Sequence, residues 1–143
     1  MQIKRLCVND HLCLVDFEIN FNTINGGSLT ILIGENGTGK STMLEIILEI
    51  LMSFDSPSIE KNIDYDYTIE YEYAQKNIVI IKIGHSYQIT IDDRVFKGSY
   101  QKINARFVDN SIFPKRIITF YSGAKNNVLR KVSKANRRYN MLC

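Results

Sequence analysis

The run GENGTGKST, at positions 34–42, constrains the fold of this chain more than any other feature. Its glycines, its lysine and the hydroxyl residue after the lysine match the spacing G-x-x-x-x-G-K-[ST], which is a phosphate-binding pattern. Glycine is needed there because the backbone must adopt positive φ and come close to phosphate oxygens. We therefore expect a nucleotide site at Gly34, Glu35, Asn36, Gly37, Thr38, Gly39, Lys40, Ser41 and Thr42.

The segments on both sides of this run predict the strand and the helix that such a loop requires. Residues 29–33 are continuously apolar, which is typical of a strand buried on both faces. Residues 42–54 are mostly apolar, and Glu45 and Glu49 lie four positions apart on one face of a helix. We expect a largely buried helix that ends at residues 55–58 and has a narrow solvent-exposed stripe, the wet stripe, along the face of these two glutamates.

The polar residues of the run have distinct predicted parts in binding a triphosphate. Successive backbone N–H groups form an anion-binding concavity, and the N-terminus of the helix adds the positive end of its dipole. We expect Lys40 to reach the β- and γ-phosphates, the Ser41 hydroxyl to bind Mg²⁺, and Thr42 to contact the α-phosphate side.

Two strands are expected before the loop. Residues 3–8 form a short apolar run interrupted by Lys4 and Arg5, and Asn9-Asp10 is a turn signal. Apolar residues then occupy every odd position of 13–21, and after Leu14 the positions between them are polar, which predicts a half-buried strand. A strong turn signal at residues 25–27 separates this strand from the buried one.

An aromatic stripe follows the predicted helix. Tyrosines and one isoleucine share one face of residues 65–73, and acidic residues and a threonine share the other. This alternation favours a sheet face packed on a core, with stacking on nucleic-acid bases as the alternative. An antiparallel meander is expected from strands at 65–73, 78–83, 87–91 and 95–96. Residues 97–114 have no clear pattern, and residues 117–121 predict one more strand.

Composition indicates a single globular domain with a basic end. The chain has 143 residues, of which 45% are hydrophobic and 23% charged. From Lys125 onward there are six basic residues and no acidic ones, so the other 124 residues hold 12 basic and 15 acidic side chains. Cys7, Cys13 and Cys143 lack metal-ligand spacing and are expected to be reduced thiols. Neither a signal peptide nor a membrane span is visible, so we expect a cytoplasmic protein.

The loop, with Asn36 at its third position and Met43-Leu44-Glu45 after it, resembles the ABC-class ATPase heads of the SMC and RecF-like group. The two leading strands strengthen the resemblance, which is strong over residues 1–54 and weak over 55–123. It implies an α/β P-loop NTPase fold, ABC-ATPase-like, with N-terminal antiparallel strands and an inserted β-meander. It also implies ATP and Mg²⁺ as cofactors, and either a homodimer with nucleotide between two heads or a larger ATPase assembly. A nucleic acid or an effector nuclease is the implied partner, in phage defence or DNA processing.

The residues that would complete hydrolysis have only weak candidates. Asp92, after the apolar residues 89–91, could orient Mg²⁺, although a hairpin turn is the favoured interpretation. Ser122-Gly123 is at best a fragment of the family's signature, and Gln101 is a conceivable Q-loop glutamine. His11 stands where many relatives have arginine, and we expect it to be a surface turn residue.

We therefore expect an incomplete head, with residues 1–123 as its N-terminal part and 124–143 as a basic tail, helical or disordered. A fragment, a truncated gene product and a split protein stay open, and the catalytic residues stay unknown. The functional alternatives are an ATPase, a non-hydrolysing nucleotide-binding or interaction module, and a small P-loop kinase using Asp92. A GTPase is disfavoured because no Asn-Lys-x-Asp run is present.

Overall fold

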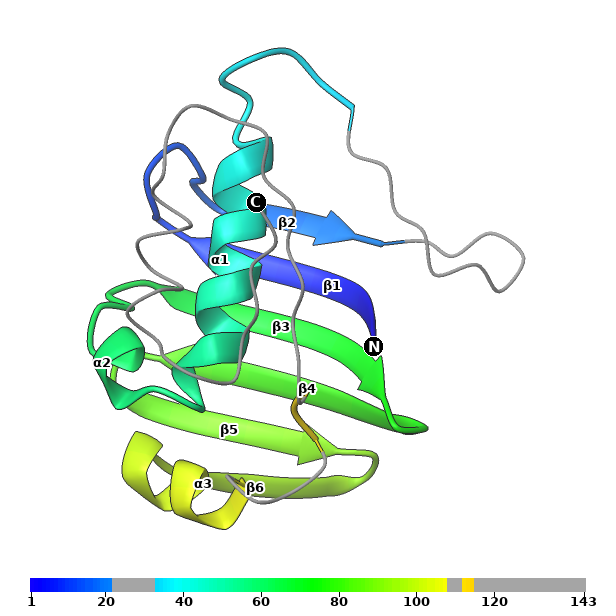
Figure 1. Cartoon of the computed structure of the whole chain (residues 1–143), viewed down its shortest axis with the longest axis vertical. Coiled ribbons are helices and arrows are strands. Elements are labelled where there is room, and N and C mark those ends of the chain that lie inside the picture. Colours follow the sequence, from blue (N-terminus) through cyan, green and yellow to red (C-terminus); the bar gives the residue numbers. More distant parts are fainter. Residues whose placement is uncertain (22–32, 108–111, 115–143) are drawn as a thin grey trace, which may run out of the picture.

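The computed structural model describes residues 1–21, 33–107 and 112–114, and the helices and strands of the fold lie in those ranges. Figure 1 shows a sheet with helices on one side. The strands are β1 (Gln2–Asn9), β2 (Phe17–Asn20), β3 (Asp66–Tyr73), β4 (Lys76–Ile83), β5 (Ser86–Ile91) and β6 (Arg94–Ser99). The helices are α1 (Lys40–Ser53), α2 (Pro57–Glu60) and α3 (Tyr100–Phe107).

These strands form one sheet in the order β2-β1-β3-β4-β5-β6, and all of its pairs are antiparallel. The predicted meander of β3 to β6 is confirmed, with two-residue turns after β4 and β5. The meander is not a separate insertion, however. Strand β3 pairs with β1 through Leu6↔Ile69 and Val8↔Tyr67, so the leading strands and the meander share one hydrogen-bonded sheet.

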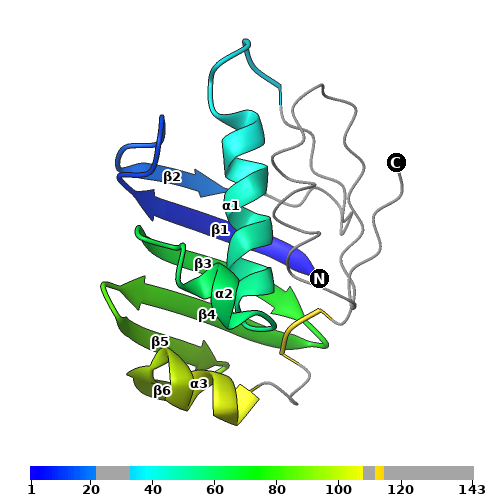
Figure 2. The ribbon, with the colours of Figure 1, turned by 60° about the vertical axis from the view of Figure 1, so that its left-hand side comes forward.

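Helix α1 lies across one face of the sheet (Figures 1 and 2), and buried side chains of the helix and of the strands form the core. Strand residues two apart point to the same face, so Tyr67, Ile69 and Tyr71 are buried together while Thr68 and Glu70 stay partly exposed. Tyr67 is 3% exposed and Tyr71 is fully buried. The core-face interpretation of the aromatic stripe is therefore confirmed, and stacking of these two rings on bases is excluded.

Helix α1 begins at the glycine-rich loop, as predicted, but the expected wet stripe was wrong at Glu49. This side chain is only 9% exposed, and its Oε2 accepts a hydrogen bond of 3.1 Å from the Tyr65 hydroxyl. Leu44 is instead 51% exposed. The helix is rotated so that Met43, Ile46 and Ile50 face the sheet, and the segment before β3 covers Glu49.

The second strand is shorter than predicted, since β2 begins at Phe17 rather than at residue 13. His11 and Leu14 exchange two backbone hydrogen bonds of 2.9 Å, which close a turn between β1 and β2. His11 lies in this turn, as expected, but its side chain is only 19% exposed and its ring centroid lies 4.1 Å from that of Tyr65. The strand was extended too far because Cys13 and Val15 continue the period-two spacing of Phe17 and Ile19, although they lie in a turn.

Helix α3 was not predicted, although Tyr100, Ile103 and Phe107 are buried at helical spacing. Its Tyr100 hydroxyl donates a hydrogen bond of 2.6 Å to the Ser53 carbonyl at the end of α1. Ile33 was expected in a buried strand and is 92% exposed outside any strand. The rest of that strand, the turn at 25–27, the strand at 117–121, the Ser122-Gly123 fragment, the boundary at 123, the basic tail and Cys143 lie outside the described residues.

Candidate phosphate-binding site

The glycine-rich loop, residues 34–39, leads directly into α1 beyond the β2 edge of the sheet (Figure 1). Gly37 has φ 89° and Gly39 has φ 86°, both in the left-handed region that glycine adopts at little cost. Gly39 is the N-cap of α1, and its carbonyl accepts the first helical hydrogen bond, 2.8 Å from the Met43 nitrogen. The loop therefore has the backbone geometry for which the spacing of its glycines was singled out.

The N-terminus of α1 presents backbone N–H groups, which are donors for an anion. The first N–H groups of a helix have no partner within it and carry the positive end of the helix dipole. Within residues 1–21, 33–107 and 112–114 no side chain caps this end, and the first turn contains no acidic residue. Ser41 is exposed and Thr42 half-buried in that turn. A phosphate placed there would meet donors and positive charge without a competing carboxylate from the first turn.

The Lys40 ammonium group lies inside its own loop. Its Nζ donates hydrogen bonds to the Gly34 carbonyl at 2.6 Å, to the Glu35 carbonyl, and to Thr38 Oγ1 at 3.3 Å. Thr38 Oγ1 in turn donates to the Glu35 carbonyl at 2.9 Å. The predicted phosphate-binding lysine is thus already aimed at the space that the loop encloses, held by exposed acceptors that a ligand can replace.

The turn between β1 and β2 touches this site, and sequence patterns did not indicate it. The Cys13 thiol donates to Thr42 Oγ1 over 3.8 Å. Leu14 is 3% exposed and packs against Gly39. Both residues were interpreted as positions in a strand, where neither would have had a part in the loop.

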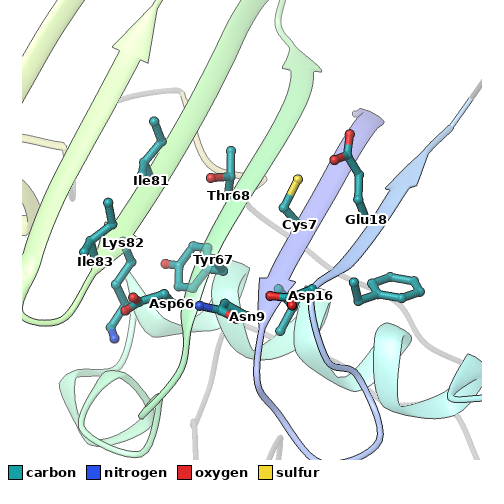
Figure 3. A pocket seen from close by; sticks show the side chains of 12 residues that line it. Cys7, Asn9, Asp16, Glu18, Asp66, Tyr67, Thr68, Ile81, Lys82 and Ile83 are labelled. Atoms are coloured by element: carbon teal, nitrogen blue, oxygen red, sulfur yellow. The ribbon is translucent and has the colours of Figure 1, made fainter.

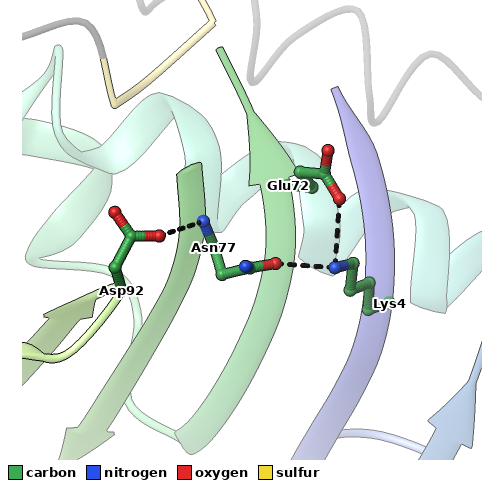
Figure 4. Close-up of polar contacts among 4 residues, drawn as sticks. All are labelled: Lys4, Glu72, Asn77 and Asp92. Atoms are coloured by element: carbon green, nitrogen blue, oxygen red, sulfur yellow. Dashed lines mark hydrogen bonds and ion pairs between the residues drawn. The ribbon is translucent and has the colours of Figure 1, made fainter. Parts of the chain in front are cut away.

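Asp92, the candidate carboxylate for Mg²⁺, lies in the hairpin turn between β5 and β6 (Figure 4). Its Oδ1 accepts from the Asn77 backbone N–H at 3.1 Å, and Asn77 Oδ1 accepts from Lys4 at 2.6 Å. Lys4 also forms an ion pair of 3.1 Å with Glu72. The favoured turn interpretation is confirmed, because Asp92 belongs to a network across the sheet and not to the glycine-rich loop.

Gln101, the conceivable Q-loop glutamine, is exposed on α3. Helix α3 packs on β5 and β6, at the opposite edge of the sheet from β2 and the loop (Figure 2). The structure therefore does not bring Gln101 to the loop. Among the residues that the structure describes, no group of three or more histidine, cysteine or acidic side chains could hold a metal ion.

A separate hollow of about 390 Å³ lies at one end of β1, β3 and β4 (Figure 3). Its lining includes Asp16, Asp66 and Lys82 and none of residues 34–42. Lys82 is 4% exposed and donates to the Tyr65 carbonyl at 3.1 Å, while Asp66 accepts from the Gly84 backbone N–H at 2.7 Å. The two groups thus have structural partners, and the hollow is not part of the candidate phosphate site.

A family model described as an AAA domain matches residues 8–140 of this chain. The match covers both the glycine-rich loop and the six-stranded sheet from the end of β1 onward. No curated protein is significantly similar to the chain. In the part that the structure describes, no helix is long and apolar enough to cross a lipid bilayer.

Proposed function

This chain belongs to the AAA domain family, and on that premise we propose that residues 34–42 bind the phosphates of ATP together with Mg²⁺. The observation that best supports the proposal is the arrangement at the start of α1. Two left-handed glycines, a helix N-terminus that no described side chain caps, and the Lys40 ammonium lie together in this short loop. These are the donors that a multiply charged phosphate group requires.

When a nucleotide binds, phosphate oxygens would replace the present hydrogen-bond acceptors of the Lys40 ammonium. Its ammonium now donates to two backbone carbonyls and to Thr38, and phosphate oxygens are stronger acceptors because they carry charge. Backbone N–H groups of the loop and of the first turn of α1 would donate to the same phosphates. The Ser41 hydroxyl would hold Mg²⁺, which neutralises charge on the β- and γ-phosphate oxygens when bound.

Binding of ATP and GTP with Mg²⁺, measured by titration calorimetry, tests the proposal. Lys40→Ala removes the central ammonium and should abolish measurable binding, while Lys61→Ala, at an exposed lysine outside the loop, should leave it unchanged. Equal binding by wild type and Lys40→Ala would show that the loop is not a phosphate site in this chain.

The family indicates an ATPase-type function, and the second candidate is a non-hydrolysing nucleotide-binding or interaction module. The position of Asp92 favours keeping this candidate, since its carboxylate is bonded to Asn77 in the sheet. Steady-state phosphate release separates the two. Turnover that Asp92→Asn abolishes would instead favour the kinase-like alternative, in which Asp92 orients Mg²⁺.

The resemblance to SMC and RecF-like heads further leads us to propose a homodimer with nucleotide between two heads. A role in phage defence or DNA processing, with a nucleic acid or an effector nuclease as partner, is proposed on the same ground. Sedimentation of the purified chain with and without Mg·ATP tests the first point. An unchanged monomer at saturating Mg·ATP would count against nucleotide-dependent pairing.

A further inference from the structure

We propose that Leu14 is a positioning residue of the phosphate site, through which the β1–β2 turn, residues 10–16, fixes Gly39 and the start of α1. The inference rests on the proposed function, because it concerns how tightly residues 34–42 bind phosphate. It goes beyond that function, because residues 10–16 lie outside the glycine-rich pattern.

The contact itself is close and specific. A Cβ atom added to Gly39 would lie 2.8 Å from Leu14 Cδ2 and 3.3 Å from Cys13 Sγ, so both side chains pack against the glycine's Cα. The Cys13 thiol reaches past Gly39 to Thr42 Oγ1 at 3.8 Å. The turn thus touches the N-cap residue and the first turn of α1.

Leu14 is the one apolar side chain of the turn that points inward. Leu12 is 74% exposed and Val15 65% exposed, whereas Leu14 is 3% exposed. Two backbone hydrogen bonds with His11 fix the position of Leu14, and the His11 ring packs against Tyr65. The turn therefore connects Gly39 to the core through the buried side chain of Leu14.

The backbone of this turn is strained at three residues. Asp10, Leu12 and Asp16 have φ of 52°, 55° and 45°, in the left-handed region that residues with a Cβ rarely adopt. Strain of this kind persists where the surrounding structure enforces it, and it concentrates at functional sites. Here the strained residues flank the segment that presses on Gly39.

Fixing Gly39 matters because glycine has the largest backbone freedom of any residue. An unsupported glycine would lose that freedom when phosphate binds, and this lost entropy weakens binding. Packing by Leu14 restricts Gly39 before the ligand arrives. The N–H groups that follow Gly39 are then held in place for a phosphate, which is preorganisation of the site.

The test compares Mg·ATP affinity between two variants with the same truncation. Leu14→Ala should weaken binding about tenfold, since small displacements of binding groups have effects of that order or larger. Leu51→Ala, at a position 2% exposed near the other end of α1, should bind as wild type once the unfolded fraction is subtracted. Leu14→Met, which keeps the volume, should restore affinity to within about threefold.

Inorganic triphosphate, as a competitor of a fluorescent ATP analogue, provides a second readout. It should lose affinity for Leu14→Ala by the same factor as Mg·ATP, because the turn acts on the phosphate cradle. If Leu14→Ala does not fold, Leu14→Val replaces it under the same criterion. Equal affinities of the Leu14 and Leu51 truncations, with Lys40-dependent binding intact, would overturn this inference alone. Binding that is insensitive to Lys40→Ala would overturn the proposed function instead.

Discussion

Gly37 and Gly39 have the same left-handed backbone conformation but different surroundings. No atom of the described part of the chain lies within 4 Å of a Cβ added at Gly37, whereas Leu14 Cδ2 would be 2.8 Å away at Gly39. Gly37→Ala should lower the free energy of unfolding by about 1–2 kcal/mol, from backbone strain alone. Gly39→Ala should lose a further ~1–3 kcal/mol from overpacking. Urea denaturation measures both, and equal losses would contradict the packing seen at Gly39.

The Thr38 side chain forms hydrogen bonds within the glycine-rich loop on both sides. Its hydroxyl donates to the Glu35 carbonyl and accepts from the Lys40 ammonium. Thr38→Val removes the hydrogen bond to the Glu35 carbonyl, which orders the loop, and should therefore weaken Mg·ATP binding about fivefold, which corresponds to roughly 1 kcal/mol. Thr38→Ser keeps the hydroxyl and serves as the matched control. The same affinity for both variants would show that this hydroxyl does not order the loop.

At the level of elements, the β1–β2 turn should respond to a ligand at the start of α1. The Cys13 thiol is exposed and bonded to Thr42, so phosphate bound there should hinder its alkylation. At ten times the Kd of Mg·ATP the rate should fall about tenfold if the bound state is unreactive. Peptide mass spectrometry follows each cysteine separately.

Cys7 in β1 is the internal reference for this experiment. It is half-buried, and this burial raises the pKa of its thiol, so it should react slowly at neutral pH. Mg·ATP should not change that rate. Cys13 alkylation that is equally fast with and without bound Mg·ATP would place the ligand away from the β1–β2 turn.

The sequence predicted well those elements that pack against a single neighbour, because one packed face gives a regular pattern of apolar residues. Residues 65–73 alternate because one face of β3 meets α1, and the strand followed directly. Leu14 and Glu49 show why the rest was missed. Each has a local pattern that indicates one environment, and a contact distant in sequence, with Gly39 and with Tyr65, that determines another.

The same reason limited what could be foreseen of the site. Residues 34–42 were found because the glycines, the lysine and the hydroxyl residues that define the pattern lie within nine consecutive positions. The packing of the β1–β2 turn on Gly39 joins segments that are far apart in the chain. Tyr100, Ile103 and Phe107 did have helical spacing, so α3 could have been predicted from the sequence.

At the scale of the whole molecule, buried tyrosines make the fold sensitive to alkali. Burial raises the pKa values of Tyr65, Tyr67, Tyr71 and Tyr87, and it raises that of Tyr100 to about 12. An unfolded tyrosine ionises near pH 10. Above that pH the unfolded chain releases protons that the folded chain retains. The contribution of these tyrosines to the free energy of unfolding is therefore fully present below pH 10 and declines above it.

For Tyr100 the decline should occupy the window between about pH 10 and 12. Each such tyrosine removes at most about 1.4 kcal/mol of the free energy of unfolding per pH unit within its window, and a partly solvated ring removes less. Tyr100→Phe should cost roughly 1 kcal/mol at pH 8, because it loses the hydrogen bond to the Ser53 carbonyl. It should also make the alkaline decline less steep, because one titrating group is gone. Urea denaturation between pH 8 and 12 tests this, and an unchanged slope would mean that Tyr100 ionises as freely in the folded protein as in the unfolded chain.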